Sequence, residues 1–313
     1  MRRRFAPPVF DNPYRVPGCW WKVALHLHTT NSDGHRSPRA AVETYRRLGY
    51  DAMAITDHDV LTRLPDHRGR PLLIPALEAT GPVAPHIVSL GSREPAPGVR
   101  LGAGKLQDAV RAIRRLGGLA VVAHPSWSGL ADADLLPLRG HLGIEIYNHV
   151  CDDLNGRGAS VELWDHLLER GRRVWGLAVD DAHFDRDGLR GGPGHGWVMV
   201  KAPRLNVRAI LHALELGSFY ATRGPRILSV ASAPGRLTVE TSPADRVHLI
   251  AAGCGSGGTR FARENGNRTR WTFEFMKAQW NVTGYARFEV VDGRGRKAWS
   301  NPLFVRSGGG RFW

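Results

Sequence analysis

The chain has 313 residues, of which 42% are hydrophobic, and a formal net charge of +14. This length allows one large domain and one small one. No run approaches the roughly 20 apolar residues of a membrane-spanning helix, so we expect no membrane partner. The basic start, 1–8, has no apolar core typical of a secretory signal, and the three scattered cysteines form no disulfide framework. We therefore expect a cytoplasmic protein.

The positive charge raises nucleic-acid binding as an alternative, because clustered cations release counterions from phosphate backbones. Arginine greatly outnumbers lysine, and the arginines are spread along the whole chain. Nucleic acid is therefore a partner that we do not favour, since a small anionic substrate would benefit equally from the positive field. The sequence leaves the oligomeric state open.

Apolar runs that end in side chains able to bind metals recur along the first two thirds of the chain. The strand expected at 22–28 ends in His26 and His28, and strand alternation puts both imidazoles on one face. Four further runs end, in chain order, in Asp57-His58-Asp59, Glu78, His124 and Asp181-Ala182-His183. One such ending could be a hydrogen-bonded pair or a solvated turn, but five together predict a metal site.

Helical patterns separate these strands. Ser37 and Pro38 offer an N-cap and a first helical residue before 40–48, and further amphipathic segments cover 106–116 and 160–170. Strands at 86–91 and 143–148 bring the number to seven. Alternating strands and helices predict a parallel (β/α) barrel with its site at the carboxyl ends of the strands.

The pattern changes after residue 225 to short alternating runs, the last pair joined by an Asp292-Gly293 turn typical of a hairpin. We predict an N-terminal extension over 1–20, a barrel over 21–228 and a small antiparallel β-sandwich-like domain over 229–313. The glycine-rich stretch 253–258 is expected to be a connection, because neither a helix nor Gly-Lys-Ser/Thr follows it.

Four motifs resemble the signatures of the polymerase and histidinol phosphatase (PHP) superfamily. They are His26-Leu27-His28 with Asp33, Asp57-His58-Asp59, Ala123-His124-Pro125 and Asp181-Ala182-His183. The resemblance covers roughly 21–228 and implies a distorted (β/α)7 barrel that holds two or three divalent metals and hydrolyses phosphoesters. The segment 209–225, which ends in Phe219-Tyr220-Ala221-Thr222-Arg223-Gly224-Pro225, and the β-rich tail after it resemble the CehA/McbA-type stand-alone branch.

The same resemblance implies the ligands of three metals. One metal would be held by His26, His28, Glu78 and Asp181, with Glu78 bridging to a second bound by His86 and His124; Asp33, His58 and His183 would hold a third. Mixed imidazole and carboxylate ligands fit manganese, iron or zinc better than magnesium or calcium. The choice among those three ions stays open.

The expected activity is that of a phosphoesterase acting on a small phosphorylated metabolite or nucleotide through a metal-activated hydroxide. Asp181 and His183 would act through the metals. Arg157 and Arg223, on predicted rim loops, are candidates for binding phosphoryl oxygens, and His149 and His195 for the general acid. The alternatives are a carboxyl or carbamate ester hydrolase on the same site, and a nucleic-acid-binding or 3′-exonuclease module.

Overall fold

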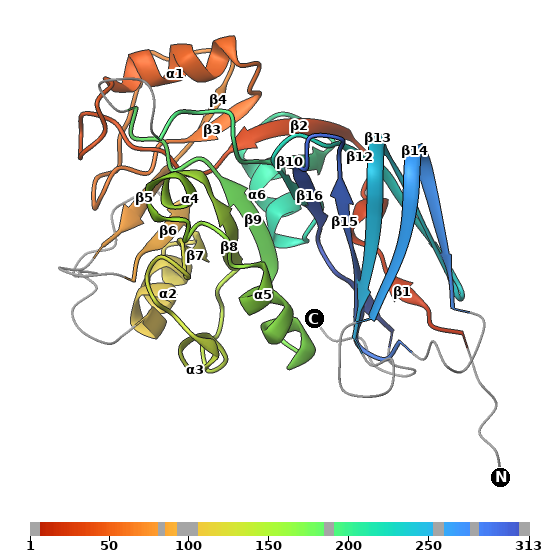
Figure 1. Cartoon of the computed structure of the whole chain (residues 1–313). Helices are drawn as coiled ribbons and strands as arrows, with labels where there is room; N and C mark the ends of the chain where they lie inside the picture. Colours follow the sequence, from red (N-terminus) through yellow and green to blue (C-terminus); the bar gives the residue numbers. More distant parts are fainter. Residues whose placement is uncertain are drawn as a thin grey trace.

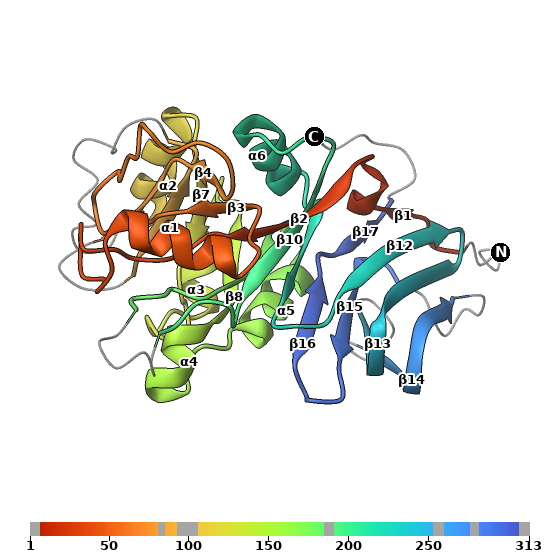
Figure 2. The same cartoon turned by 90° about the horizontal axis from the view of Figure 1, so that it is seen from above.

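The chain has a mixed α/β fold in the computed structural model, which describes residues 7–80, 85–92, 106–184, 191–252, 260–275 and 282–306 (Figures 1 and 2). The glycine-rich stretch 253–258 lies outside these residues. No described helix is long and apolar enough to cross a membrane. The helices are η1 (Pro13–Arg15), α1 (Pro38–Arg47), α2 (Leu106–Arg115), α3 (Asp132–Leu135), α4 (His149–Asn155), α5 (Val161–Glu169) and α6 (Val207–Glu215).

One sheet joins the start of the chain to its end. Its strands are β1 (Phe10–Asp11), β2 (Cys19–Ala24), β3 (Ala52–Ala54), β4 (Leu72–Ile74), β10 (Trp197–Ala202), β11 (Phe219–Thr222), β12 (Ile227–Ala233), β13 (Arg236–Ala251), β14 (Arg260–Glu274), β15 (Tyr285–Val291), β16 (Lys297–Ser300) and β17 (Leu303–Val305). The strands β2, β3 and β4 are parallel, whereas β10 runs antiparallel to β2 and to β11. From β11 the sheet continues through β16 into the C-terminal strands.

The second sheet contains β5 (Ala76–Ala79), β6 (Ile87–Leu90), β7 (Leu119–Val122), β8 (Gly143–Asn148) and β9 (Trp175–Val179), in that order. The strand β6 is antiparallel to both β5 and β7, so the expectation of an all-parallel arrangement is wrong there. The physical reason is the short 80–86 connection, since a parallel crossover needs a dozen or more residues.

The described strands form two sheets that do not close into one barrel. Two isolated parallel bridges lie beyond the ladders, Leu27 with Ala182 and His58 with Glu78. The first bridge joins the segment that follows β2 to the segment that follows β9. The second bridge joins the segment that follows β3 to the strand β5. The bridges therefore bring the predicted ligand segments together, while the closed seven-stranded barrel stays a prediction.

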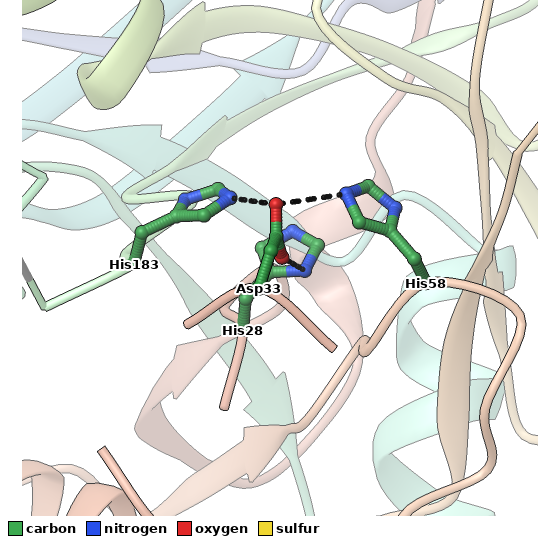
Figure 3. Close-up of side chains that lie close together, drawn as sticks. All are labelled: His28, Asp33, His58 and His183. Carbon is green, nitrogen blue, oxygen red and sulfur yellow. Dashed lines mark ion pairs between the residues drawn. The ribbon is translucent and has the colours of Figure 1, made fainter. Parts of the chain in front are cut away.

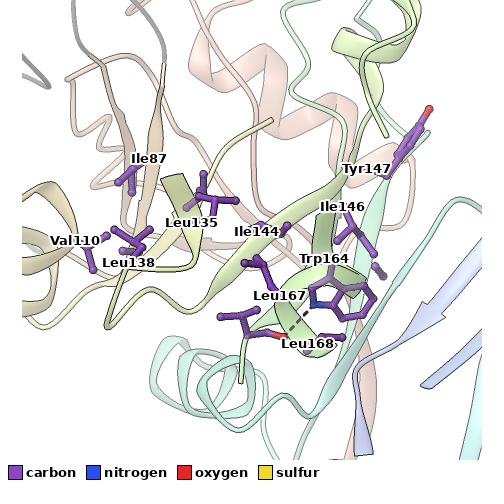
Figure 4. Close-up of a cluster of buried hydrophobic side chains, with 14 of the residues drawn as sticks. Ile87, Val110, Leu135, Leu138, Ile144, Ile146, Tyr147, Trp164, Leu167 and Leu168 are labelled. Carbon is purple, nitrogen blue, oxygen red and sulfur yellow. Dashed lines mark hydrogen bonds between the residues drawn. The ribbon is translucent and has the colours of Figure 1, made fainter. Parts of the chain in front are cut away.

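The predicted helices form close to their expected bounds. The Ser37 side chain accepts a hydrogen bond from Ala40 N and caps α1, which begins at Pro38. The apolar side of α2 buries Ala109, Val110 and Ile113. Figure 4 shows these contacts continuing into a cluster around Trp164 of α5, whose indole donates to Val174 O at 3.0 Å. The amphipathic patterns therefore mark the faces that pack on the second sheet.

The C-terminal strands pair antiparallel, as predicted, and the Asp292 turn links β15 to β16. Their contact with α5 includes a buried ion pair. The Arg287 guanidinium, 1% exposed, donates to both Asp165 oxygens at 2.7 and 2.6 Å, and lies 4.9 Å from the Trp164 ring. The pair therefore ties β15 to the helix that covers β8; the division at 228 stays a prediction.

We predict that Asp165→Ala lowers the free energy of unfolding by about 3 kcal/mol, because it leaves the buried guanidinium of Arg287 without its counter-charge. The double variant Asp165→Ala/Arg287→Met should lose less, since no unpaired charge remains. Urea unfolding measures both. Asp66→Ala, which breaks an exposed pair with Arg39, is the control and should cost under about 1 kcal/mol. A double variant less stable than Asp165→Ala would contradict the prediction.

Candidate metal centre

All nine predicted ligands gather at one place in the structure. The described residues form three sets, and within each set all the ligand atoms lie within 4.8 Å of one another. The sets are His28, Asp33, His58 and His183; His26, His28 and Asp181; and His58, Glu78 and His86. His124 joins them through a contact with Glu78. The strand ends predicted from the sequence thus converge, and each set offers nitrogen and oxygen donors.

The innermost group has His26, His28, Glu78 and Asp181, all nearly buried. The Nε2 atoms of His26 and His28 are 3.2 Å apart, and each lies 3.3 Å from Glu78 Oε2. Asp181 Oδ1 lies 3.2 Å from His26 Nε2 and 3.0 Å from His28 Nε2. The two imidazole nitrogens therefore lie close to carboxylate oxygens from two other parts of the chain, and the ligand atoms of His26, His28 and Asp181 lie within 4.8 Å of one another.

The other oxygen of Glu78 faces a second imidazole pair. Glu78 Oε1 lies 3.1 Å from His86 Nδ1 and 3.2 Å from His124 Nε2. The two carboxylate oxygens thus point to different donor groups. That arrangement is suited to a bridging carboxylate.

The third group lies nearer to solvent. Figure 3 shows Asp33 between His183 and His58, with His28 close by. Asp33 Oδ2 is 3.2 Å from His183 Nε2 and 3.5 Å from His58 Nε2, and Oδ1 is 3.4 Å from His28 Nδ1. The side chain of Asp33 is 52% exposed, so this group is open to exchange with solvent whereas the innermost one is closed.

Three buried polar atoms in the centre have no hydrogen-bond partner among the described residues: Glu78 Oε2, Asp181 Oδ1 and His58 Nδ1. They lie 3.0 to 3.3 Å from one another or from neighbouring imidazole nitrogens without making a hydrogen bond, and burying polar atoms without hydrogen bonds is costly. Ligands about 2.1 Å from a tetrahedral metal lie about 3.4 Å from one another, close to the 3.0 to 3.2 Å separations among His26, His28 and Asp181. The residues therefore fit a divalent metal.

Two of the ligands have a strained backbone. The φ angle is +28° at His124 and +54° at Asp181, both in a region that side chains other than glycine seldom adopt. Strain of this kind persists when surrounding contacts hold it, and it clusters at functional sites. It turns these two side chains inward directly after β7 and β9.

A buried residue that was not predicted from the sequence orients three of the ligands. Glu145, in the middle of β8, accepts from His26 Nδ1 at 2.6 Å through Oε1. Its Oε2 accepts from His124 N and from Asn148 Nδ2, whose amide also donates to Asp181 Oδ2. A carboxylate on the far nitrogen of a metal-binding imidazole fixes its tautomer and direction. The available signal was a glutamate inside an otherwise apolar strand, because such a group needs buried partners.

Two further carboxylates hold the loops of the centre. Buried Asp57 accepts from Thr29 N, Thr29 Oγ1 and Ser32 Oγ, and also from Thr62 Oγ1, so it fixes the turn that carries Asp33. Buried Asp180 accepts from the backbone of 194–196 and from two tyrosine hydroxyls. Asp57 thus belongs to a predicted motif but supports the site from outside the ligand groups.

The residues predicted to bind phosphate or to act as the general acid lie in different surroundings. Arg223 is 33% exposed, with its guanidinium 4.1 Å from the Tyr147 ring centroid and 3.9 Å from Asp152 Oδ2. The rings of His149 and His195 stack at 3.9 Å. Burial, and then the neighbouring His195, lower the pKa of His149 to about 4. Arg157 is exposed in the turn after α4 and is not part of this cluster.

Residues 24–152 match the model of the PHP domain, which supports the PHP superfamily for this chain. No curated protein matches. Among solved structures, a two-domain protein from Bacteroides vulgatus containing a predicted PHP-like metal-dependent phosphoesterase is 19% identical; the match covers 90% of this chain and 94% of that one, with a TM-score of 0.49.

Two other structures resemble shorter parts of the chain. A Bifidobacterium adolescentis protein, provisionally named a metal-dependent phosphoesterase, is 18% identical over 61% of this chain and 96% of its own, with a TM-score of 0.41. An amidohydrolase from Chromobacterium violaceum with bound sulfate and no metal is 19% identical. The match covers 51% of this chain and 87% of that one, with a TM-score of 0.39. Likenesses this low carry no argument about function.

We predict that Glu145→Gln weakens metal binding by about 10- to 100-fold, because an amide cannot accept from His26 on one side and from His124 and Asn148 on the other. Competition with a chromophoric chelator measures the affinity. Glu215→Gln, which changes a half-exposed glutamate paired with Arg114 on α2, is the matched control. Wild-type affinity in Glu145→Gln would show that the network does not orient the ligands.

Metal binding should also release protons. Burial lowers the pKa of His183 and His58, but Asp33 and the neighbouring carboxylates outweigh it and raise the pKa to about 9 and about 10. Both imidazoles are therefore protonated near pH 7 in the metal-free protein and must lose those protons to bind. Manganese affinity should rise with pH between about 6 and 9, and calorimetry in buffers of different ionisation enthalpy should detect the protons. A pH-independent affinity would contradict this.

Proposed function

We propose that this chain is a metal-dependent hydrolase that cleaves a phosphoester of a small anionic metabolite or nucleotide. The observation that carries the proposal is the pair of buried carboxylate oxygens, Glu78 Oε2 and Asp181 Oδ1, which accept no hydrogen bond and lie 3.3 and 3.0 Å from His28 Nε2. The match of 24–152 to the PHP domain supports it.

In this proposal the ligands divide among up to three ions. His26, His28, Glu78 and Asp181 would hold the first, and His86 and His124 would hold the second together with the other oxygen of Glu78. Asp33, His58 and His183 hold the third. Bound ions of this kind activate water and offset the charge of a phosphoryl group. The mixed donors favour manganese, iron or zinc.

The chain's own polar side chains would then bind the substrate and move a proton. The Arg223 side chain is 33% exposed, so its guanidinium can donate to a phosphoryl oxygen. His195 is exposed and can give a proton to the leaving oxygen. His149 is neutral near pH 7 because of its lowered pKa, so its part is to hold the His195 ring by stacking. Arg157 would contact only the outer part of a substrate.

We also propose the fold, domain, branch and location that the sequence predicts. They are a closed (β/α)7 barrel over 21–228, a small β domain over 229–313, the CehA/McbA-type branch and a cytoplasmic location. The exposed position of Asp33 supports a third metal that exchanges more readily than the other two.

We predict that Asp181→Asn and His183→Ala each lower phosphate release by at least about 100-fold and lower bound metal, while the fold is kept, because each removes a ligand. The measurements are phosphate release from phosphomonoesters, phosphodiesters and nucleotides by manganese-loaded protein, and metal content by elemental analysis. Asp66→Asn, which makes the same chemical change at an 82% exposed position, is the control for Asp181→Asn.

Full activity in either ligand variant would refute the metal assignment. If wild-type protein binds metal but releases no phosphate from any class, the phosphoester proposal is wrong. Carboxyl and carbamate esters are the substrates to assay in that case, because the same ions can also polarise a carbonyl group.

A further inference from the structure

A half-exposed tryptophan stands beside the second group of ligands. Trp127 lies in the turn after β7 and is 37% exposed. Its ring centroid is 4.9 Å from that of His124 at 79°, an edge-to-face contact, and 6.2 Å from that of His86. These two imidazoles contact Glu78 Oε1. An organic group attached to a phosphoryl group at this end of the centre would therefore lie near the indole.

The turn that carries Trp127 is held firmly on both sides. Ser126 Oγ donates to Ala159 O at 2.8 Å, and Ser126 N donates to Ser160 Oγ at 3.2 Å. Ser128 Oγ lies 3.1 Å from His124 Nδ1. The indole is thus fixed before any ligand arrives, which lowers the entropy cost of binding to it.

The exposure of Trp127 is unusual within the described part of the chain. The other large apolar side chains exposed there are aliphatic: Val9, Leu48, Val60, Leu154 and Leu228. The indole Nε1 of Trp127 makes no hydrogen bond to a described residue, whereas those of Trp164 and Trp299 donate to protein oxygens. An aromatic ring left partly open, with a free donor, beside buried polar ligands is suited to contact a ligand.

We propose that Trp127 is a specificity-determining residue that selects phosphoesters whose organic group is a flat aromatic ring, an aryl group or a nucleobase. This inference rests on the proposed phosphoesterase function. The ring of the substrate packs against the indole while its phosphoryl group occupies the metal centre. Aliphatic phosphoesters of similar size lack this contact and bind less well.

Competitive inhibition by phosphonates tests the inference, because phosphonates are not hydrolysed and the leaving-group pKa does not enter. The probes are 1-naphthylmethylphosphonate, adenosine 5′-phosphonate and butylphosphonate. Trp127→Ala should raise the inhibition constant of at least one aromatic probe by about 5- to 100-fold, the range for loss of one stacking contact, and change that of butylphosphonate less than about two-fold. Trp127→Phe should restore much of the loss. The more affected aromatic probe identifies the aryl or nucleobase class.

Two controls keep the outcomes separate. Leu228→Ala removes an exposed apolar side chain from β12 and should leave all three constants unchanged. Metal content must match wild type. An equal loss for all probes, or a loss of metal, would mean that Trp127 only supports His124, and the inference would be overturned. If wild-type protein hydrolyses no phosphoester, the proposed function fails and this inference with it; hydrolysis without a selective effect overturns the inference alone.

Discussion

Two carboxylates removed from water set the main constraint on this structure. Glu78 and Asp181 are at most 5% exposed at their side chains, and an isolated ion there would be very costly. Burial by itself would raise the pKa of Glu78, but His26, His124 and His28 outweigh it and hold the pKa well below its usual range. The carboxylates stay ionised only because imidazoles from several strand ends meet there, so the convergence of those strands is also an electrostatic requirement.

A second layer of carboxylates makes that convergence rigid. Asp57 holds the loop after β2, Glu145 holds the imidazole of His26 and the backbone N–H of His124, and Asp180 holds the segment before β10. Each of them is almost saturated with donors that come from other segments. Glu78 Oε2 and Asp181 Oδ1 accept no hydrogen bond, whereas both oxygens of each supporting carboxylate accept at least one. This division lets the inner atoms bind an ion while the surrounding chain keeps its shape.

The sequence could predict what depends on local pattern. The two histidines predicted to share a face of a strand do lie together, with Nε2 atoms 3.2 Å apart, although β2 ends at Ala24 and both follow it. The cap at Ser37 fixed the start of α1. The direction of β6 was mispredicted, although the short connection before it was readable. The helix α4 was not predicted, because its N-cap, Asn148, is also the last residue of the apolar strand β8. The positive φ of Asp181 could not be read, since it depends on contacts between distant segments.

The continuity of the larger sheet has a consequence for how the chain can be divided. The strand β11 is hydrogen-bonded on one side to β10 and on the other to β16. A chain ending at 228 would leave the outer backbone of Phe219–Thr222 unpaired, and these residues are buried in the whole protein. Unpaired, apolar edges of this kind recruit other strands and aggregate. The C-terminal strands therefore protect the sheet that carries β2 from self-association, whatever else they do.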